Sequence, residues 1–147
     1  MPSVDLNCDL GDSEPAVLPG TRELLTLVTS VNIACGVHAG TPATVAENVR
    51  LAVQAGVVIG AHPGLLDREG EGRRSLTLSP QEAYPLMLYQ LGAVAALVRN
   101  EGARLAHVKP HGALYNMASQ DRALADAIAA AVKSFDPGLR LVGLSGG

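Results

Sequence analysis

The 147-residue sequence is poor in aromatic side chains and cysteine, and neither sign of charge dominates it. Aromatic residues make up 3% of the chain and tryptophan is absent, which argues against the stacking platforms of single-stranded nucleic-acid binders. Eleven basic and 14 acidic residues give a formal charge of -3, so the clustered basic surface of a nucleic-acid-binding domain is not indicated.

Long apolar runs and phosphate-binding motifs are also missing. No run approaches the roughly 20 residues of a membrane helix, and no basic segment followed by an apolar one opens the chain. Two cysteines are too few for a disulfide scaffold. We therefore expect a cytoplasmic protein with free thiols that contacts neither membrane nor nucleic acid. The sequence contains neither a G-x-G-x-x-G nor a G-x-x-x-x-G-K-[ST] phosphate loop.

What is present is the composition of a single globular α/β domain over residues 1–147, 48% hydrophobic and 17% charged. The two-residue alternation of β-strands occurs in five segments, residues 4–10, 30–37, 57–63, 106–111 and 140–145. Helical periodicity occurs between them, at residues 21–29, 42–55, 80–100 and 120–133, and Thr41 and Ser79 are expected to cap the second and third of these helices. Strands that alternate with helices predict a parallel sheet joined by right-handed crossovers.

Each predicted strand has one apolar face and one face of small or polar residues. A doubly wound sheet is covered by helices on both faces, so its strands are apolar on both. The pattern therefore favours a partial parallel β/α barrel with helices outside and a polar interior. At about 30 residues per unit, the chain supplies five such units.

Residues 107–116 carry the most informative pattern. His107, Lys109 and His111 share one parity, so two imidazoles and an ammonium lie on one face of this strand. One histidine on a strand is more often structural than functional, but the other strands also end in polar residues, at the edge where barrels place their chemistry. We expect these polar residues to converge on one mouth of the barrel: Asn7, Asp9, Asn32, His38, His62, Lys109, His111 and Ser145.

These residue types suit acid–base and electrostatic catalysis. The candidate catalytic residues are Asp9, His38, His62, Lys109 and His111. Aspartate or histidine can serve as a general base, and Lys109 can stabilise an oxyanion. The candidate metal ligands are Asp9, His38, His62 and His111. They come singly from different strands, so structural and general-base histidines compete with a metal site, and the sequence leaves that choice open.

The loop at residues 64–78 is long and charged, and is either functional or a solvated loop of balanced charge. Its Arg73 and Arg74 are candidates to bind a substrate carboxylate or phosphate.

Four strings carry a resemblance: VDLNCDLG at residues 4–11, VNIACGVHAG at 31–40, IGAHPG at 59–64 and VKPHGALYN at 108–116. In this order they resemble the LamB/YcsF family, along essentially the whole chain. The resemblance implies an irregular seven-stranded β/α barrel related to sugar-deacetylase barrels. Five of those seven strands fit in this chain, so it resembles an amino-terminal portion that is incomplete at its carboxyl end.

The resemblance also implies an activity. It is that of an ATP-dependent 5-oxoprolinase, a hydrolase that opens the cyclic amide of 5-oxo-L-proline to L-glutamate while ATP, with Mg²⁺, is hydrolysed to ADP and phosphate. The implied partners are the 5-oxoprolinase subunits B and C. The implied substrate-binding residues are Asn7, Asn32, Arg73, Arg74, Tyr115 and Asn116.

Two other hypotheses stay open beside this one. The first is a metal-dependent, deacetylase-like hydrolase on the same scaffold, and the second is a truncated or assembly-only subunit without catalytic activity. A wall of five strands cannot close, so we expect exposed strand edges that make the isolated chain inactive and unstable, homo-oligomeric or completed by another chain.

Overall fold

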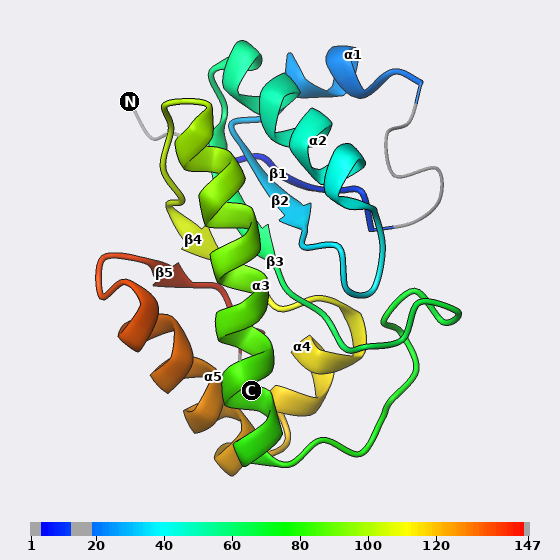
Figure 1. The fold of residues 1–147 in the computed structure, drawn as a ribbon, viewed down its shortest axis with the longest axis vertical. Coiled ribbons are helices and arrows are strands. Elements are labelled where there is room, and N and C mark those ends of the chain that lie inside the picture. Colours follow the sequence, from blue (N-terminus) through cyan, green and yellow to red (C-terminus); the bar gives the residue numbers. More distant parts are fainter. Residues whose placement is uncertain (1–3, 13–18, 146–147) are drawn as a thin grey trace.

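The computed structural model describes residues 4–12 and 19–145 and has five strands and five helices (Figure 1). The strands are β1 (Asn7–Leu10), β2 (Ser30–Ala34), β3 (Val58–His62), β4 (His107–Val108) and β5 (Arg140–Leu141). The helices are α1 (Thr21–Leu25), α2 (Pro42–Ala55), α3 (Pro80–Asn100), α4 (Gly112–Ala118) and α5 (Arg122–Phe135).

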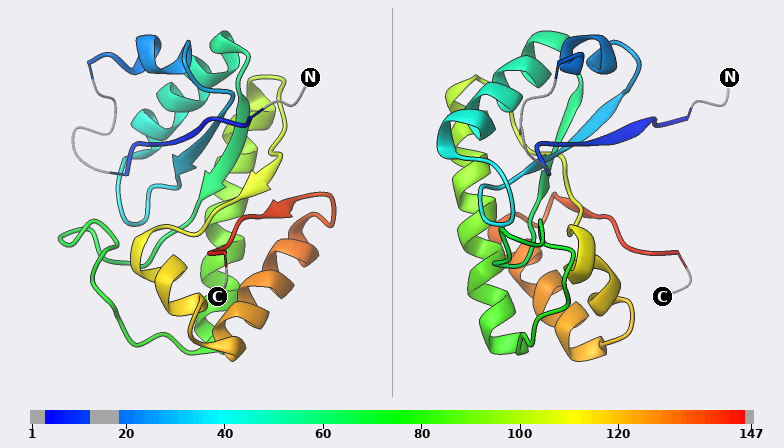
Figure 2. Two further views of the ribbon diagram at one scale, coloured as in Figure 1. Left: turned by 180° about the vertical axis from the view of Figure 1, so that it is seen from behind. Right: turned by 90° about the vertical axis from the view of Figure 1, so that its right-hand side faces the viewer.

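All five strands are parallel, and their order in the sheet is their order in the chain. Helices α2 and α3 lie behind the sheet when it is viewed from its other face (Figure 2, left). A sheet whose strands follow chain order, with its helices on one side, is an arc of a β/α barrel wall. The predicted partial barrel is therefore confirmed.

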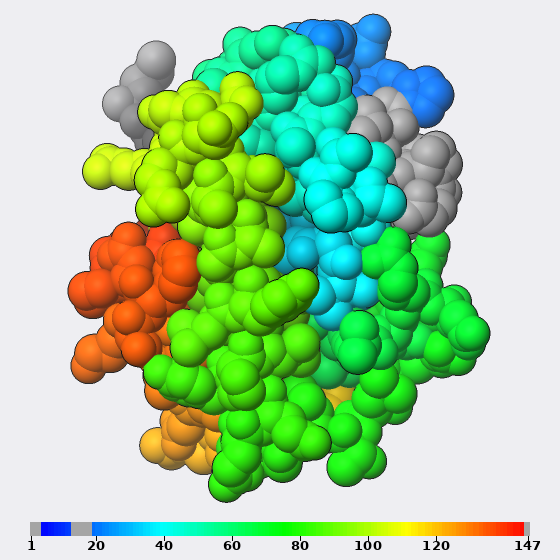
Figure 3. All heavy atoms as spheres, viewed as in Figure 1, coloured from blue at the N-terminus to red at the C-terminus, as the bar shows by residue number. Residues whose placement is uncertain are grey.

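The core lies between the sheet and its helices, whose side chains cover the face shown in Figure 3. Val31 and Ile33 of β2 are fully buried, as are Met87, Leu91 and Val94 of α3. Apart from Met87, these residues belong to the apolar faces that the sequence indicated. Their burial anchors the strands whose opposite side carries the polar groups.

Helices α2 and α3 begin at the predicted capping residues. The Thr41 hydroxyl accepts a hydrogen bond from the Thr44 N–H at 3.2 Å. The Ser79 hydroxyl likewise accepts one from the Glu82 N–H at 3.3 Å, and the Glu82 carboxylate accepts the Ser79 N–H at 2.9 Å. Each cap satisfies backbone donors that the first helical turn leaves without partners.

The two edge strands are shorter than predicted. β1 begins at Asn7, and Val4 and Leu6, which the alternation assigned to a packed face, are 78% and 55% exposed. β5 ends at Leu141, and the apolar side chains of Val142 and Leu144 are also exposed. Alternation specifies which side chains share a face, but burial needs an element packed over that face.

Helix α4 was not predicted. It has seven residues and starts at Gly112, which has a positive φ of 50°, and no side chain caps it. Only the apolar spacing of Ala113, Leu114, Met117 and Ala118 signals it, and it is too short for periodicity to reveal. The helix lies at the carboxyl end of β4, where it forms one wall of the site.

Among the residues that the structure describes, no helix is long and apolar enough to cross a membrane.

Candidate functional site

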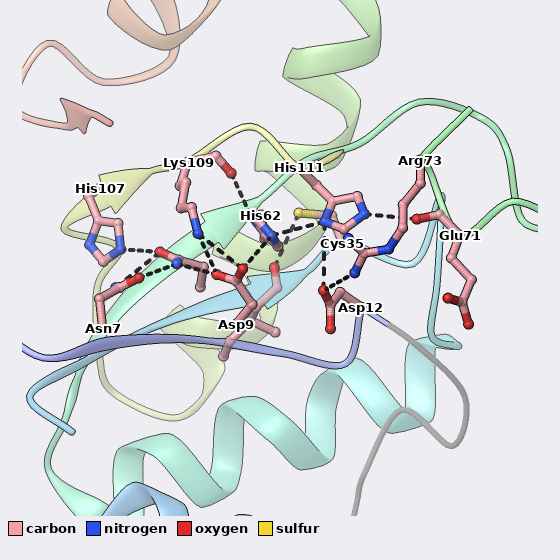
Figure 4. Close-up of polar contacts among 12 residues, drawn as sticks. Asn7, Asp9, Asp12, Cys35, His62, Glu71, Arg73, His107, Lys109 and His111 are labelled. Carbon is pink, nitrogen blue, oxygen red and sulfur yellow. Dashed lines mark hydrogen bonds and ion pairs between the residues drawn. The ribbon is translucent and has the colours of Figure 1, made fainter. Parts of the chain in front are cut away.

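Polar side chains form one continuous row across the open face of the sheet (Figure 4). At one end, the Asn32 side chain bridges β1 and β4. Its oxygen lies 2.6 Å from Nε2 of His107, which therefore donates, and its amide nitrogen donates to Asp9 Oδ1 at 2.6 Å. A side chain at Gly60 would meet the His107 ring at 2.1 Å, which explains the glycine in β3.

Asp9 and Lys109 form the centre of the row. Lys109 Nζ lies 2.9 Å and 3.0 Å from the two carboxylate oxygens of Asp9, and His62 Nε2 lies 3.4 Å from Oδ2. Burial works to raise the pKa of Asp9. The hydrogen bonds and charge of His62, with hydrogen bonds from Asn32 and Lys109, outweigh it and hold that pKa below its ordinary value of 3.8. Asp9 is thus a fixed anion.

His62 and His111 face each other at the next position, with His62 Nε2 3.1 Å from His111 Nδ1. The other nitrogen of each ring meets a backbone carbonyl. His62 Nδ1 lies 2.6 Å from the Lys109 oxygen, and His111 Nε2 lies 2.8 Å from the Glu71 oxygen. A carbonyl only accepts, so both of these outer nitrogens carry the proton. Burial lowers the pKa of His111, and the Glu71 carbonyl opposes that shift only in part.

His38 lies flat against His111, with ring centroids 4.0 Å apart and an interplanar angle of 3°. It is 1% exposed, and within the described residues neither of its ring nitrogens has a hydrogen-bond partner. Burial and the nearby His111 and His62 lower its pKa to about 3. Because the lone pairs of parallel rings lie in separate planes, His38 does not point at the facing nitrogens of His62 and His111. It is therefore not a ligand in common with them.

The row borders a pocket of about 290 Å³ at the carboxyl ends of β3 and β4. Its lining residues are Asp9, Asp12, His62, Arg73, Lys109, Pro110, His111, Gly112, Tyr115 and Asn116. The convergence predicted for the strand ends is therefore confirmed for Asp9, His62, Lys109 and His111. Tyr115 and Asn116 reach the pocket because α4 turns there. Asn7 and Asn32 lie at one end of the row, outside the lining of the pocket, where Asn32 is fully buried and holds Asp9. Ser145 is not among the residues that line the pocket either.

Asp12 is a site residue that the sequence pattern did not reveal. Its Oδ2 lies 3.1 Å from the Arg73 guanidinium and 3.8 Å from His111 Nδ1. It comes just after β1, in a stretch with the composition of a loop. Only its place two residues after the end of a strand could have indicated that it belongs to the site. One oxygen of Asp12 and one nitrogen each of His62 and His111 all lie within 4.8 Å of one another. This group shares His62 and His111 with the predicted metal ligands, but contains Asp12 in place of Asp9 and His38.

The two arginines that were predicted to bind substrate lie in different surroundings. Arg73 reaches the pocket, whereas Arg74 bonds the buried carboxylate of Asp67 through its Nε at 2.9 Å. Arg74 is therefore a partner within the loop, and the structure gives no support to the prediction that it binds substrate. Burial of Asp67 requires such a partner, because an unpaired carboxylate inside a protein is costly.

Two anchors position the 64–78 loop over the site, so it is not a freely solvated loop. The Gln90 side chain of α3 accepts from the Gly64 N–H and donates to the Gly64 carbonyl, each at 2.9 Å. The Arg68 guanidinium donates to the carbonyls of Gly36 and Gly40 at 2.9 Å and 2.8 Å, joining this loop to the one before α2. The anchors place the Glu71 carbonyl against His111.

Comparison with known proteins identifies the family to which this chain belongs. The sequence model of the LamB/YcsF family matches residues 4–147. The chain belongs to the LamB/YcsF family. It is 57% identical over 146 residues to the A subunit of 5-oxoprolinase from Geobacillus kaustophilus, covering 99% of this chain and 57% of that protein. It is 54% identical over 143 residues to the protein of the same name from Bacillus subtilis, covering 97% of this chain and 56% of that protein.

A solved structure of the family has the same fold. The crystal structure of "Lactam Utilization Protein" from Thermus thermophilus is 52% identical, with a TM-score of 0.93. The match covers 98% of this chain and 59% of the Thermus chain. This LamB/YcsF chain thus spans less than three fifths of the length of these relatives.

Gly72 is where the loop approaches the histidines most closely. It has a φ of +70°, and an added Cβ would lie 2.8 Å from Cδ2 of His111 and 2.9 Å from Cβ of His38. We expect Gly72→Ala to lower the free energy of unfolding by about 2–3 kcal/mol, from backbone strain plus steric displacement, as measured by urea denaturation. The control is Gly102→Ala, which has a φ of +74° and nothing within 4 Å of the added Cβ. Equal losses in the two variants would contradict the close packing.

Proposed function

We propose that this chain provides the ring-opening site of an ATP-dependent 5-oxoprolinase that works with subunits B and C in the cytoplasm. The names of its relatives support the reaction and a complex of several subunits. The observation that carries the proposal is the Asp9–Lys109 pair in the lining of the pocket, because it places a fixed carboxylate beside a fixed ammonium. Hydrolysis of an amide needs both, a group that takes a proton from water and a cation beside the carbonyl oxygen.

ATP supplies the activation that a stable lactam lacks. Transfer of the γ-phosphoryl group from ATP to the amide oxygen releases ADP and makes the ring carbon electrophilic. Water adds to that carbon as Asp9 takes its proton, and the carbon–nitrogen bond then breaks with a proton delivered to nitrogen. The resulting acyl phosphate reacts with a second water to give the carboxylate of glutamate and inorganic phosphate.

The chain's own residues suit the polar ends of such a substrate. Lys109 balances the charge that develops on the activated oxygen. Arg73 lies at the rim with its side chain 57% exposed, where it can bind the substrate carboxylate. Tyr115 and Asn116 of α4 line the same pocket and provide further hydrogen-bonding groups.

The test is ATP-dependent glutamate release from 5-oxo-L-proline with subunits B and C. Three proteins are compared: this chain, a longer relative, and a chimaera of that relative in which these 147 residues replace the matching segment. Glutamate formed by the chimaera only with ATP, and lost in its Asp9→Asn variant, supports the proposal. A folded chimaera without turnover, beside an active relative, would overturn it.

A metal-dependent, deacetylase-like hydrolase is the second candidate, favoured by the grouping of Asp12, His62 and His111. It differs from the first in two measurable ways. Hydrolysis would proceed without ATP, and an N-acetylated sugar would be cleaved where 5-oxo-L-proline would not.

A further inference from the structure

The facing nitrogens of His62 and His111 present an electrostatic conflict. Because His62 Nδ1 and His111 Nε2 are committed as donors to carbonyl oxygens, the neutral rings turn two lone pairs toward each other. These nitrogens are 3.1 Å apart. Two lone pairs at that distance repel, so the arrangement requires a positive centre: either a proton on His62 Nε2, which also lies 3.4 Å from Asp9 Oδ2, or a metal ion that both nitrogens bind.

Hydrogen bonding of this kind is typical of metal-binding histidines. A ligating imidazole usually donates its other N–H to a carbonyl or carboxylate, which fixes the tautomer and the ring orientation. Both rings do so here, and both are at most 2% exposed. Two nitrogens bound at about 2.1 Å to one ion, at an angle of about 95°, would be about 3.1 Å apart.

A third donor completes a recognisable ligand set. Asp12 Oδ2 lies 3.8 Å from His111 Nδ1, on the side that opens to the pocket. Two imidazoles and one carboxylate suit divalent zinc, cobalt, iron and manganese, and leave positions for water or substrate. The Arg73 guanidinium also contacts Asp12 at 3.1 Å and would compete with a cation for it.

We propose that His62, His111 and Asp12, which all line the pocket, bind one divalent first-row transition-metal ion. Asp9 is not a ligand in this site, because it is held by Lys109 and Asn32. Metal binding is independent of the proposed ring-opening reaction, since it is measured on the chain without substrate, ATP or partner subunits.

The experiment is a titration of the chelator-treated chain with Zn²⁺ by calorimetry and with Co²⁺ by visible absorption. We expect one ion per chain and a Co²⁺ spectrum with nitrogen and oxygen ligands. His62→Gln and His111→Gln should each weaken binding about 100-fold or more, because they remove a ligand directly. Asp12→Asn should weaken it at least 10-fold, and Arg73→Ala should tighten it by removing the competing cation.

Matched controls separate ligand loss from structural damage. His107→Gln alters another buried histidine that bonds Asn32 outside the proposed set, and should retain full affinity. Asp126→Asn removes an exposed carboxylate on α5 and should also bind normally. Thermal melting followed by circular dichroism shows which variants are folded.

Nitrogen NMR of the wild-type rings keeps the proposal testable if a variant fails to fold. With Zn²⁺ bound, the shifts of His62 Nε2 and His111 Nδ1 should report metal ligation. A proton on one facing nitrogen that persists with excess metal would overturn the proposal, because the pair would then share a proton. A sulfur-to-cobalt charge-transfer band would also overturn it, because it would place the ion on Cys8 or Cys35.

Discussion

Replacing Lys109 with alanine is expected to lower kcat/KM for ATP-dependent ring opening about 100- to 1,000-fold, the range seen when one oxyanion donor is removed. The ammonium contacts both oxygens of Asp9 and lines the pocket, so it is positioned to stabilise charge on the substrate. The Lys109 side chain is 25% exposed and that of Asp9 is 31% exposed. Solvent therefore screens the ion pair, and we expect a stability loss of about 1 kcal/mol.

The measurements are steady-state kinetics in the chimaera described above and urea denaturation of the 147-residue chain. Lys133→Ala is the control, because it removes the ammonium of an exposed lysine on α5. It should change neither quantity. A Lys109→Ala variant with intact turnover and a large loss of stability would show that Lys109 is structural.

Acidification below pH 6.5 is expected to destabilise the metal-free chain steeply. Burial lowers the pKa of His38 to about 3, and burial also lowers that of His107 and His111. In the unfolded chain these groups bind protons near their ordinary value of 6.5, so below that pH the unfolded state holds more protons. The free energy of unfolding then falls with pH, by about 1.4 kcal/mol per pH unit for each fully affected histidine.

The effect of His38 spans the window from pH 6.5 down to about 3. Asp9 acts in the same direction at lower pH, because its depressed pKa gives stability that is present above 3.8 and lost as the pH falls through the folded value. Urea denaturation in a chelator at a series of pH values from about 7.5 to about 4.5 measures the slope.

His38→Phe is the matched variant for the acid prediction. Phenylalanine does not titrate, can stack on His111, and gives up no hydrogen bond among the described residues. We expect it to reduce the slope by the contribution of one proton. An unchanged slope would show that His38 is protonated equally in the folded and unfolded states.

The sequence predicted those parts of the site that depend on which face of a strand a side chain occupies. Alternation in β4 placed His107, Lys109 and His111 on one face, and the structure shows each of them in the polar row. The capping residues of α2 and α3 were also predictable, because their hydrogen bonds are local. Periodicity and capping depend on residues that are close together in the sequence, so they predicted local structure correctly.

Features that depend on loop paths were not predictable. Arg73 and Arg74 are neighbours in a charged loop, and only the folded path sends one to the pocket and the other to Asp67. Asp12 joins the histidines because of where the chain turns after β1. The tautomers of His62 and His111 are set by the carbonyls of Lys109 and Glu71, and no side-chain pattern records where a carbonyl points.

The order of strands in the sheet has a consequence for biosynthesis. Each strand pairs with its sequence neighbours, so the wall can grow one strand at a time as the chain leaves the ribosome. The polar row does not grow in this way, since Asp9 and Lys109 are 100 residues apart in sequence and Asn32 and His107 are 75 apart. Asp9 and Asn32 therefore stay hydrated, without their partners on β4 and just after it, until that part of the chain has been synthesised. Assembly of the row is a late folding event. A spectroscopic signal from the row would therefore report when β4 pairs with β3 during folding.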